Sequence, residues 1–181
     1  MPWRYGMSRL IIDGYNLIGT LHGDLESRRK RLVKRLVRYR AAKGHDITVV
    51  FDGHGGLSPR ETLQTDGGVR IVFSRIARKA DDVIKDMLVQ GGGGFIVVSS
   101  DREIADFAWA RGSVPVGSGE FLRKLDEALL DDGEAGGGET MDEVTLKVLA
   151  DEEEETGTVR KGASRRPSKR RKAVMRALNK L

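Results

Sequence analysis

The sequence contains no cysteine, which excludes disulfides, thiol nucleophiles and zinc sites with cysteine ligands, and a reducing cytoplasm fits this composition. No stretch approaches the roughly 20 apolar residues of a membrane span. Residues 1–9 are too short and too polar for a secretory signal. Histidine is scarce as well, with scattered positions at His22, His45 and His54. A metal site in this chain would therefore have to use carboxylates, hydroxyls and water.

Two motifs that would indicate nucleotide binding are also missing. No G-x-x-x-x-G-K-[ST] occurs, which excludes a P-loop. The first apolar run is followed by D-G-Y-N and not by a glycine fingerprint, which excludes a dinucleotide site.

Charge is unevenly distributed along the 181 residues, whose net charge is +5. Residues 131–156 hold 11 acidic residues and one basic residue, whereas residues 157–181 hold 10 basic residues and no acidic one. We therefore predict a folded domain over residues 1–130, an acidic Gly-rich linker and a basic tail. The tail suits a polyanionic partner, although the adjacent linker can partly neutralise it.

The first 130 residues alternate between short apolar runs and segments with helical spacing. Apolar runs of this kind are typical of buried parallel strands, so we predict an α/β fold with a Rossmann-like, mostly parallel sheet between two helical layers. The predicted strands cover residues 10–12, 47–51, 69–73, 95–98 and 114–116. Residues 57–68 are predicted to form a long loop, and residues 69–73 and 114–116 to lie at sheet edges.

The C-terminal part is predicted to add little to the core, which should end near residue 130. Apolar positions between Met141 and Leu149 allow one short amphipathic helix in the linker, and residues 172–181 allow another in the tail. Much of the tail is expected to be disordered on its own.

Three of the predicted strands run directly into an acid, namely Asp13, Asp52 and Asp101. A single acid in this position would most simply cap the next helix, but three of them suggest a site. Right-handed crossovers bring the carboxyl ends of parallel strands to one edge, where α/β proteins bind ligands. Asp81 and Asp82 open a predicted helix that should face the same edge.

Carboxylates gathered at one edge would raise one another's pKa unless a cation shared the site. Oxygen ligands favour Mg²⁺ or Mn²⁺, and such an ion can polarise a phosphodiester and activate water. Asp13, Asp81 and Asp101 are the strongest candidates. Asp52 is a weaker candidate for a metal ligand, and we expect it to orient a basic group. Successive helical residues point about 100° apart, so only one of Asp81 and Asp82 should face the site, and we favour Asp81.

Polar neighbours of these acids allow two interpretations each. The amide of Asn16 can hold a metal-bound water or a substrate oxygen without adding charge. Ser99 and Ser100 could position substrate, or could simply satisfy the turn that follows their strand. For His54, a hydrogen bond to loop backbone is the simpler interpretation.

Basic residues near these acids suggest how RNA could reach them. The predicted helix over residues 24–44 carries nine cations and one Glu on its outer face, among them Arg31, Arg35 and Arg38. Arg75, Arg78 and Lys79 precede the Asp81–Asp82 turn. Phosphate contacts of this kind give affinity without sequence information.

Five segments, in order, carry a resemblance to a known family: IIDGYNLI, VVFDGHGG, QTDGGVRIVFSR, KADDVIKDM and VVSSDREIADFA. Together they resemble the YacP-like branch of the NYN-domain ribonucleases, within the PIN-like nuclease group, over residues 8 to about 130. The resemblance implies a PIN-like fold and a metal-dependent endoribonuclease. Its acidic site corresponds to Asp13, Asp81 and Asp101, with Asn16 as polar companion and Asp52 at the sheet edge. Some members resemble ribosome-associated mRNA endonucleases, which makes the ribosome a candidate partner.

Two other functions stay open on the sequence. Aspartyl-phosphate hydrolases also use a strand-end Asp, but they usually place a second Asp two residues on, where this chain has Tyr15. A non-catalytic RNA-binding or ribosome-binding protein is the alternative of a different class, although every expected acid is present.

Overall fold

A computed structural model describes residues 7–19, 24–53, 60–131 and 168–181. Six strands form one sheet in the order β3-β4-β2-β1-β5-β6, and all neighbours except β3 and β4 are parallel. The strands are β1 (Arg9–Asp13), β2 (Asp46–Phe51), β3 (Thr62–Asp66), β4 (Val69–Phe73), β5 (Phe95–Val98) and β6 (Val114–Val116). The predicted α/β fold with a mostly parallel sheet is confirmed.

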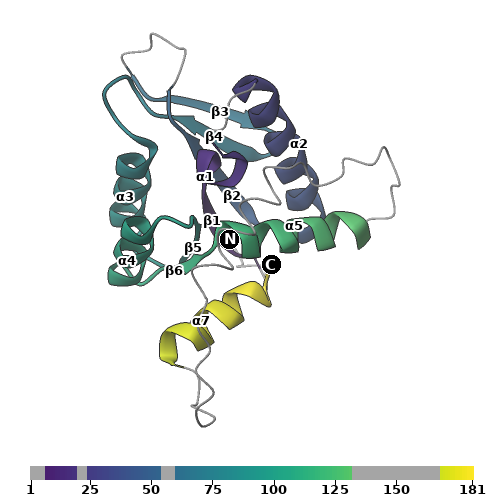
Figure 1. The fold of residues 1–181 in the computed structure, drawn as a ribbon, viewed down its shortest axis with the longest axis vertical. Helices are drawn as coiled ribbons and strands as arrows, with labels where there is room; N and C mark the ends of the chain where they lie inside the picture. The colour runs from purple at the N-terminus through teal and green to yellow at the C-terminus, as the bar shows by residue number, and fades with distance from the viewer. Residues whose placement is uncertain (1–6, 20–23, 54–59, 132–167) are drawn as a thin grey trace, which may run out of the picture.

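Helices cover both faces of the sheet (Figure 1). They are α1 (Gly14–Ile18), α2 (Leu25–Lys43), α3 (Ala80–Gln90), α4 (Arg102–Ala110), α5 (Ser118–Asp131) and α7 (Lys169–Leu178). Alternate residues of the central strand point to opposite layers: Leu10 and Ile12 pack with α2 and α5, and Ile11 packs with α3 and α4. This alternation explains why the middle of β1, Leu10 to Ile12, is a continuous apolar run. None of the helices in the described ranges is long and apolar enough to cross a membrane.

The segment that precedes β4 differs from its prediction as a loop. Thr62–Asp66 forms β3, which pairs antiparallel with β4 and leaves β4 inside the sheet instead of at its edge. Gly67 and Gly68 connect the two strands with positive φ angles of 50° and 82°, as a two-residue hairpin turn requires. Four of the five β3 residues are exposed. The segment therefore has no apolar run from which a strand could have been predicted.

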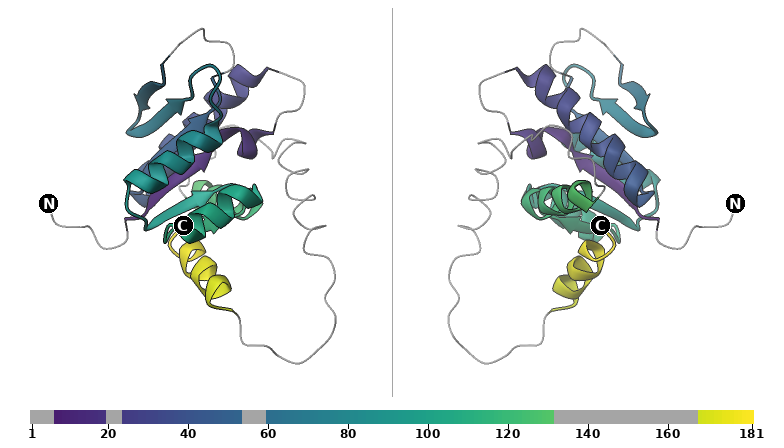
Figure 2. Two further views of the ribbon diagram at one scale, coloured as in Figure 1. Left: turned by 90° about the vertical axis from the view of Figure 1, so that its left-hand side faces the viewer. Right: turned by 90° about the vertical axis from the view of Figure 1, so that its right-hand side faces the viewer.

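The opposite edge of the sheet is β6, as predicted, and α7 lies beside it (Figures 1 and 2). Ala177 and Leu181 are buried in the same core cluster as β1 and α5. The prediction that the core ends near residue 130 is therefore wrong for the final helix, which also begins three residues earlier than predicted. The acidic linker over 132–156, its predicted helix around Met141–Leu149 and residues 157–167 lie outside the described residues.

One buried hydrogen bond ties this final segment to α2. The Tyr39 hydroxyl donates to the Leu181 carbonyl oxygen at 2.9 Å, and the Tyr39 ring meets Phe121 edge-on at 5.7 Å between centroids. Tyr39→Phe is expected to lower the free energy of unfolding by about 1–2 kcal/mol in urea titrations, because it leaves a buried carbonyl without its donor. The same substitution in a chain that ends at residue 167 should cost almost nothing. An equal cost in both chains would contradict this role.

Candidate active site

Asp13 is the buried centre of the site. It ends β1, is 7% exposed and caps α1, where the Asn16 N–H donates to its Oδ1 at 3.2 Å. The Ser99 hydroxyl donates to its Oδ2 at 3.3 Å. Burial is the main reason that the pKa of Asp13 rises to about 6, and the nearby carboxylates of Asp81 and Asp52 raise it further. Asp13 therefore caps α1 and also lies near other carboxylates, and its role in a functional site stays a prediction.

Asp81 lies across from Asp13 in the first turn of α3. Burial raises its pKa, and the charges of Asp101 and Asp52 act in the same direction, against the lowering effect of Lys85 and Lys79. Asp82, the next residue, is exposed. The structure thus places one acid of this pair toward the other carboxylates, which agrees with the choice made from helical geometry.

Asp101 caps α4 from the end of the β5 segment. Its Oδ1 accepts hydrogen bonds from the N–H groups of Glu103 at 2.7 Å and Ile104 at 3.0 Å. Its own N–H donates to the Ser99 hydroxyl at 3.1 Å. Ser99 therefore joins the Asp13 and Asp101 segments and satisfies the turn that follows its strand, while its positioning of substrate stays a prediction.

Asp52 holds the start of α3 in place. Its Oδ1 accepts from the Ala80 N–H at 2.6 Å, which supplies the cap that Lys79 does not provide from its own side chain. This bond fixes the helical turn that carries Asp81. Asp52 thus orients a neighbouring segment, as predicted, but the group that it holds is the Ala80 backbone amide and not a basic side chain.

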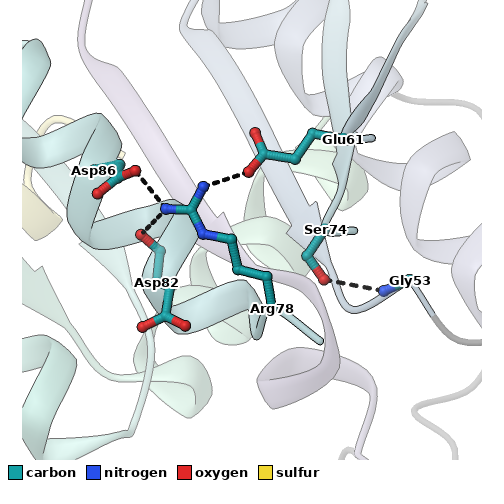
Figure 3. Close-up of polar contacts among 6 residues, drawn as sticks. All are labelled: Gly53, Glu61, Ser74, Arg78, Asp82 and Asp86. Carbon is teal, nitrogen blue, oxygen red and sulfur yellow. Dashed lines mark hydrogen bonds and ion pairs between the residues drawn. The ribbon is translucent and has the colours of Figure 1, made fainter. Parts of the chain in front are cut away.

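The backbone at Asp52 is itself fixed by close packing of two strand ends. The Gly53 N–H donates to the Ser74 hydroxyl at 3.1 Å (Figure 3). A Cβ at position 53 would lie 2.1 Å from the Ser74 carbonyl oxygen, so only glycine fits here. The β2 and β4 ends can therefore approach closely enough to set the direction of Asp52.

Asn16 joins three segments at the same edge. Its carbonyl oxygen accepts from the Ser100 N–H at 2.8 Å and from the Ser118 hydroxyl at 2.5 Å. Within the described residues its NH₂ group has no protein partner, so that group is the part able to donate to a ligand. Ser118, at the start of α5, was missed in the sequence because it lies 102 residues from Asn16 and matches no local motif.

The predicted basic residues are split between surface and structural positions. Arg75 and Lys79 are exposed beside the α3 turn, and Arg31 is exposed on α2. Arg78 instead pairs with Glu61 and Asp86 and donates to the Asp82 carbonyl (Figure 3). Arg35 pairs with Asp126. Figure 3 shows Arg78 between α3 and the segment that leads into β3. Its ion pairs therefore stabilise the contact between these two segments. Arg38 is half-buried on α2, and His54 lies outside the described residues.

The candidate ligands for a divalent cation at this edge are the carboxylates of Asp13, Asp81 and Asp101. Among the residues that the structure describes, no three Asp, Glu or His side chains are grouped as ready-made metal ligands. The three acids therefore do not form a closed cage. Their chemistry still fits Mg²⁺ or Mn²⁺, because Mg²⁺ keeps several waters and needs only one or two protein carboxylates. The raised pKa values of Asp13 and Asp81 indicate negative charge that a cation would relieve.

Comparisons with known proteins agree on one family. The model of the YacP-like NYN domain matches residues 10–134. "Uncharacterized protein YacP" from Bacillus subtilis (strain 168) is 31% identical over 90 residues, which are 45% of this chain and 51% of that protein. The chain thus matches about half the length of this curated relative.

Two crystal structures of Rae1 (YacP) from Bacillus subtilis, one of them of a mutant, have similar folds. The TM-score is 0.57 for both, at 21% identity for the mutant and 22% for the other. The match to the mutant covers 79% of this chain and 91% of the mutant chain. The match to the other structure covers 83% of this chain and 86% of that chain. At this level of identity, the likeness shows a shared fold.

Proposed function

Since the chain belongs to the YacP-like NYN domain family, a family of RNA-related nucleases, we propose that it is a metal-dependent endoribonuclease that hydrolyses phosphodiester bonds in RNA. One observation carries the proposal. Asp13, buried at the carboxyl edge of the central strand, has its pKa raised by burial and by Asp81, which is itself coupled to Asp101. An edge with this concentration of carboxylates suits a cation and a phosphate.

Asp13, Asp81 and Asp101 would hold the Mg²⁺ or Mn²⁺ ion, in part through water. When bound, such an ion polarises a phosphodiester and lowers the pKa of a water nucleophile. Ser99 keeps Asp13 and Asp101 in register, and Asp52 keeps the Asp81 turn in place. The Asn16 NH₂ group is placed to donate to a substrate oxygen without adding negative charge.

RNA would reach this edge over exposed cations. Arg75 and Lys79 flank the α3 turn, and Arg31 and Arg38 extend the basic surface along α2. Arg35 and Arg78 contribute mainly through their ion pairs with Asp126, Glu61 and Asp86. These contacts would neutralise phosphates and give salt-dependent affinity.

We extend the proposal to mRNA cleavage in association with the ribosome in the cytoplasm, on the family resemblance. Co-sedimentation with ribosomes tests this part separately from cleavage. A non-catalytic RNA-binding role is the second candidate, because phosphate contacts from exposed cations such as Arg75 and Lys79 need no metal.

Cleavage of RNA by the wild-type chain in Mg²⁺ or Mn²⁺, and its loss in EDTA, is the expected result for the endonuclease. Asp81→Asn should lower the rate about 100-fold or more, in the range seen when one charge-stabilising group is removed from an active site. Asp82→Asn is the matched control, because this exposed neighbour loses the same charge. Binding of RNA by the wild type without cleavage would support the non-catalytic RNA-binding role instead. Equal rates for the two variants would contradict the assignment of Asp81.

A further inference from the structure

A cavity of about 370 Å³ is lined by residues of the first half of α2, of β2 and of the β3–β4 hairpin. Its floor is formed by Phe51 and Phe73, its helical side by Arg29 and Val33, and its outer rim by Gln64 and Asp66. The volume lies at the small end of the range for ligand pockets. No motif in the sequence predicted it, because its lining comes from four separate elements.

Phe73 contributes an aromatic ring to the lining of the cavity, with the Arg29 guanidinium over that ring. It is only partly buried and stacks on the fully buried Phe51, with centroids 5.7 Å apart and ring planes 24° apart. The Arg29 guanidinium carbon lies 5.5 Å from the Phe73 centroid. A ring next to a guanidinium plane is the pair of surfaces on which proteins stack unpaired bases.

Tyr15 connects the cavity to the acidic edge. Its hydroxyl donates to the Asp52 carbonyl oxygen at 3.4 Å and accepts from Arg29 Nη1 at 3.5 Å. Its ring contacts Phe51 edge-on at 5.4 Å between centroids. Asp52 in turn caps the helix that carries Asp81. Tyr15 and Asp52 therefore link Arg29, at one side of the cavity, to the helical turn that carries Asp81.

The charges of the residues that line the cavity disfavour the binding of an anion. Asp66 and Glu26 line the cavity together with Arg29 and Lys30, and Lys30 pairs with Glu26 at 2.7 Å. This balance leaves little net positive charge for a phosphate. A neutral, planar group with polar edges fits better, because it can stack on Phe73 while Gln64 and Asp66 reach its edge.

We propose that this cavity binds one base of the RNA strand close to the scissile phosphate, with the base stacked on Phe73 beside Arg29. The inference rests on the proposed endoribonuclease function and deepens it, since it places a base-binding subsite beside the acidic edge. Phe73 and Arg29 would hold the strand in place, and the acids would act on the phosphate.

The test uses a short single-stranded RNA that carries 2-aminopurine, with the full chain in EDTA so that binding is measured without cleavage. Stacking on Phe73 should quench the fluorescence on binding. Phe73→Leu, which keeps an apolar side chain without the ring, should abolish the quenching and weaken binding about fivefold to a hundredfold, the range for loss of one stacked base. Phe73→Tyr should restore both. Melting curves check that each variant is folded.

Arg29→Met is expected to weaken binding and reduce the quenching, whereas Lys34→Met removes one charge from the same helix away from the cavity and should leave the quenching unchanged. Unaltered quenching and affinity in Phe73→Leu would overturn the proposal, as would equal effects of Arg29→Met and Lys34→Met. In cleavage assays, Phe73→Leu should raise KM more than it lowers kcat. A wild type that quenches but never cleaves would refute the endonuclease and leave the base site standing. Cleavage with no effect of Phe73→Leu on quenching or KM would refute the base site alone.

Discussion

Asp13→Asn is expected to make the folded chain more stable at pH 8 and, at the same time, unable to cleave RNA at a measurable rate. In the folded chain the Asp13 pKa is raised from 3.8 to about 6, so the folded state binds this proton more tightly than the unfolded state. Well below pH 3.8 the carboxyl is protonated in both states and the penalty is absent. Between pH 3.8 and about 6 the unfolded state releases this proton while the folded state still holds it, so the fold loses stability across this window. Above about pH 6 both states are ionised, and the cost of burying the negative charge in the folded state stays at its full value.

The size of this effect follows from the difference in pKa. About two pKa units correspond to about 3 kcal/mol, which is an upper limit for the gain in Asp13→Asn. The Asn amide must also replace a carboxylate oxygen that accepts from Ser99, so we expect a net gain of about 1–2 kcal/mol.

Urea unfolding at pH 4, 6 and 8 in EDTA measures this prediction. The advantage of Asp13→Asn should be near zero at pH 4 and largest at pH 8, and the exposed control Asp82→Asn should show no comparable trend. Addition of Mg²⁺ should stabilise the wild type and close the gap, since a cation that binds only the folded state raises its stability. A gap that is independent of pH would contradict the raised pKa as its cause.

Gly14→Ala is expected to destabilise the chain by up to about 3 kcal/mol, the upper end of the usual cost of overpacking. A Cβ at position 14 would lie 2.2 Å from Cε1 of Phe51. Phe51 is fully buried between Tyr15 and Phe73, so its ring cannot move without disturbing both neighbours. RNA cleavage should fall as well, because Asp13 and Asn16 flank the displaced backbone.

Two comparisons make this prediction specific. Gly92→Ala introduces a side chain at a φ of +69° with open space around it, so it should cost only about 1 kcal/mol through backbone strain. Combining Gly14→Ala with Phe51→Leu should recover part of the lost stability, because the smaller side chain removes the overlap. Additive losses in the double variant would show that Phe51 is not the group that Gly14 must avoid.

The sequence was most informative where one segment carries its own signal. Apolar runs that end on Asp13 and Asp52, and the run that leads to Asp101, predicted the strands and the edge at which these acids lie, since parallel topology leaves few alternatives. Helical geometry favoured Asp81 over Asp82, and the structure shows Asp82 exposed and Asp81 near other carboxylates, while the role of Asp81 in the site stays a prediction. Each of these inferences needed only local pattern and the handedness of the crossovers.

What could not be predicted depends on contacts between distant segments. The polar β3 becomes a strand because β4 offers it an edge, not because its own residues favour burial. Arg78 has the sequence context of an RNA contact, and only the fold shows its pairs with Glu61 and Asp86. The cavity lining brings together Arg29 of α2 and Phe73 of β4, which are 44 residues apart in the sequence and match no local motif.

The position of α7 beside β6 has a consequence for biosynthesis. An edge strand with unpaired backbone groups can pair with other chains, and a covering helix prevents this. Because α7 follows all six strands in the chain, the ribosome completes the sheet before it makes the helix that lies against β6. The nascent domain therefore passes through an interval in which β6 is open to pairing with neighbouring nascent chains, and aggregation in that interval should depend on the residues of β6 and not on those of α7.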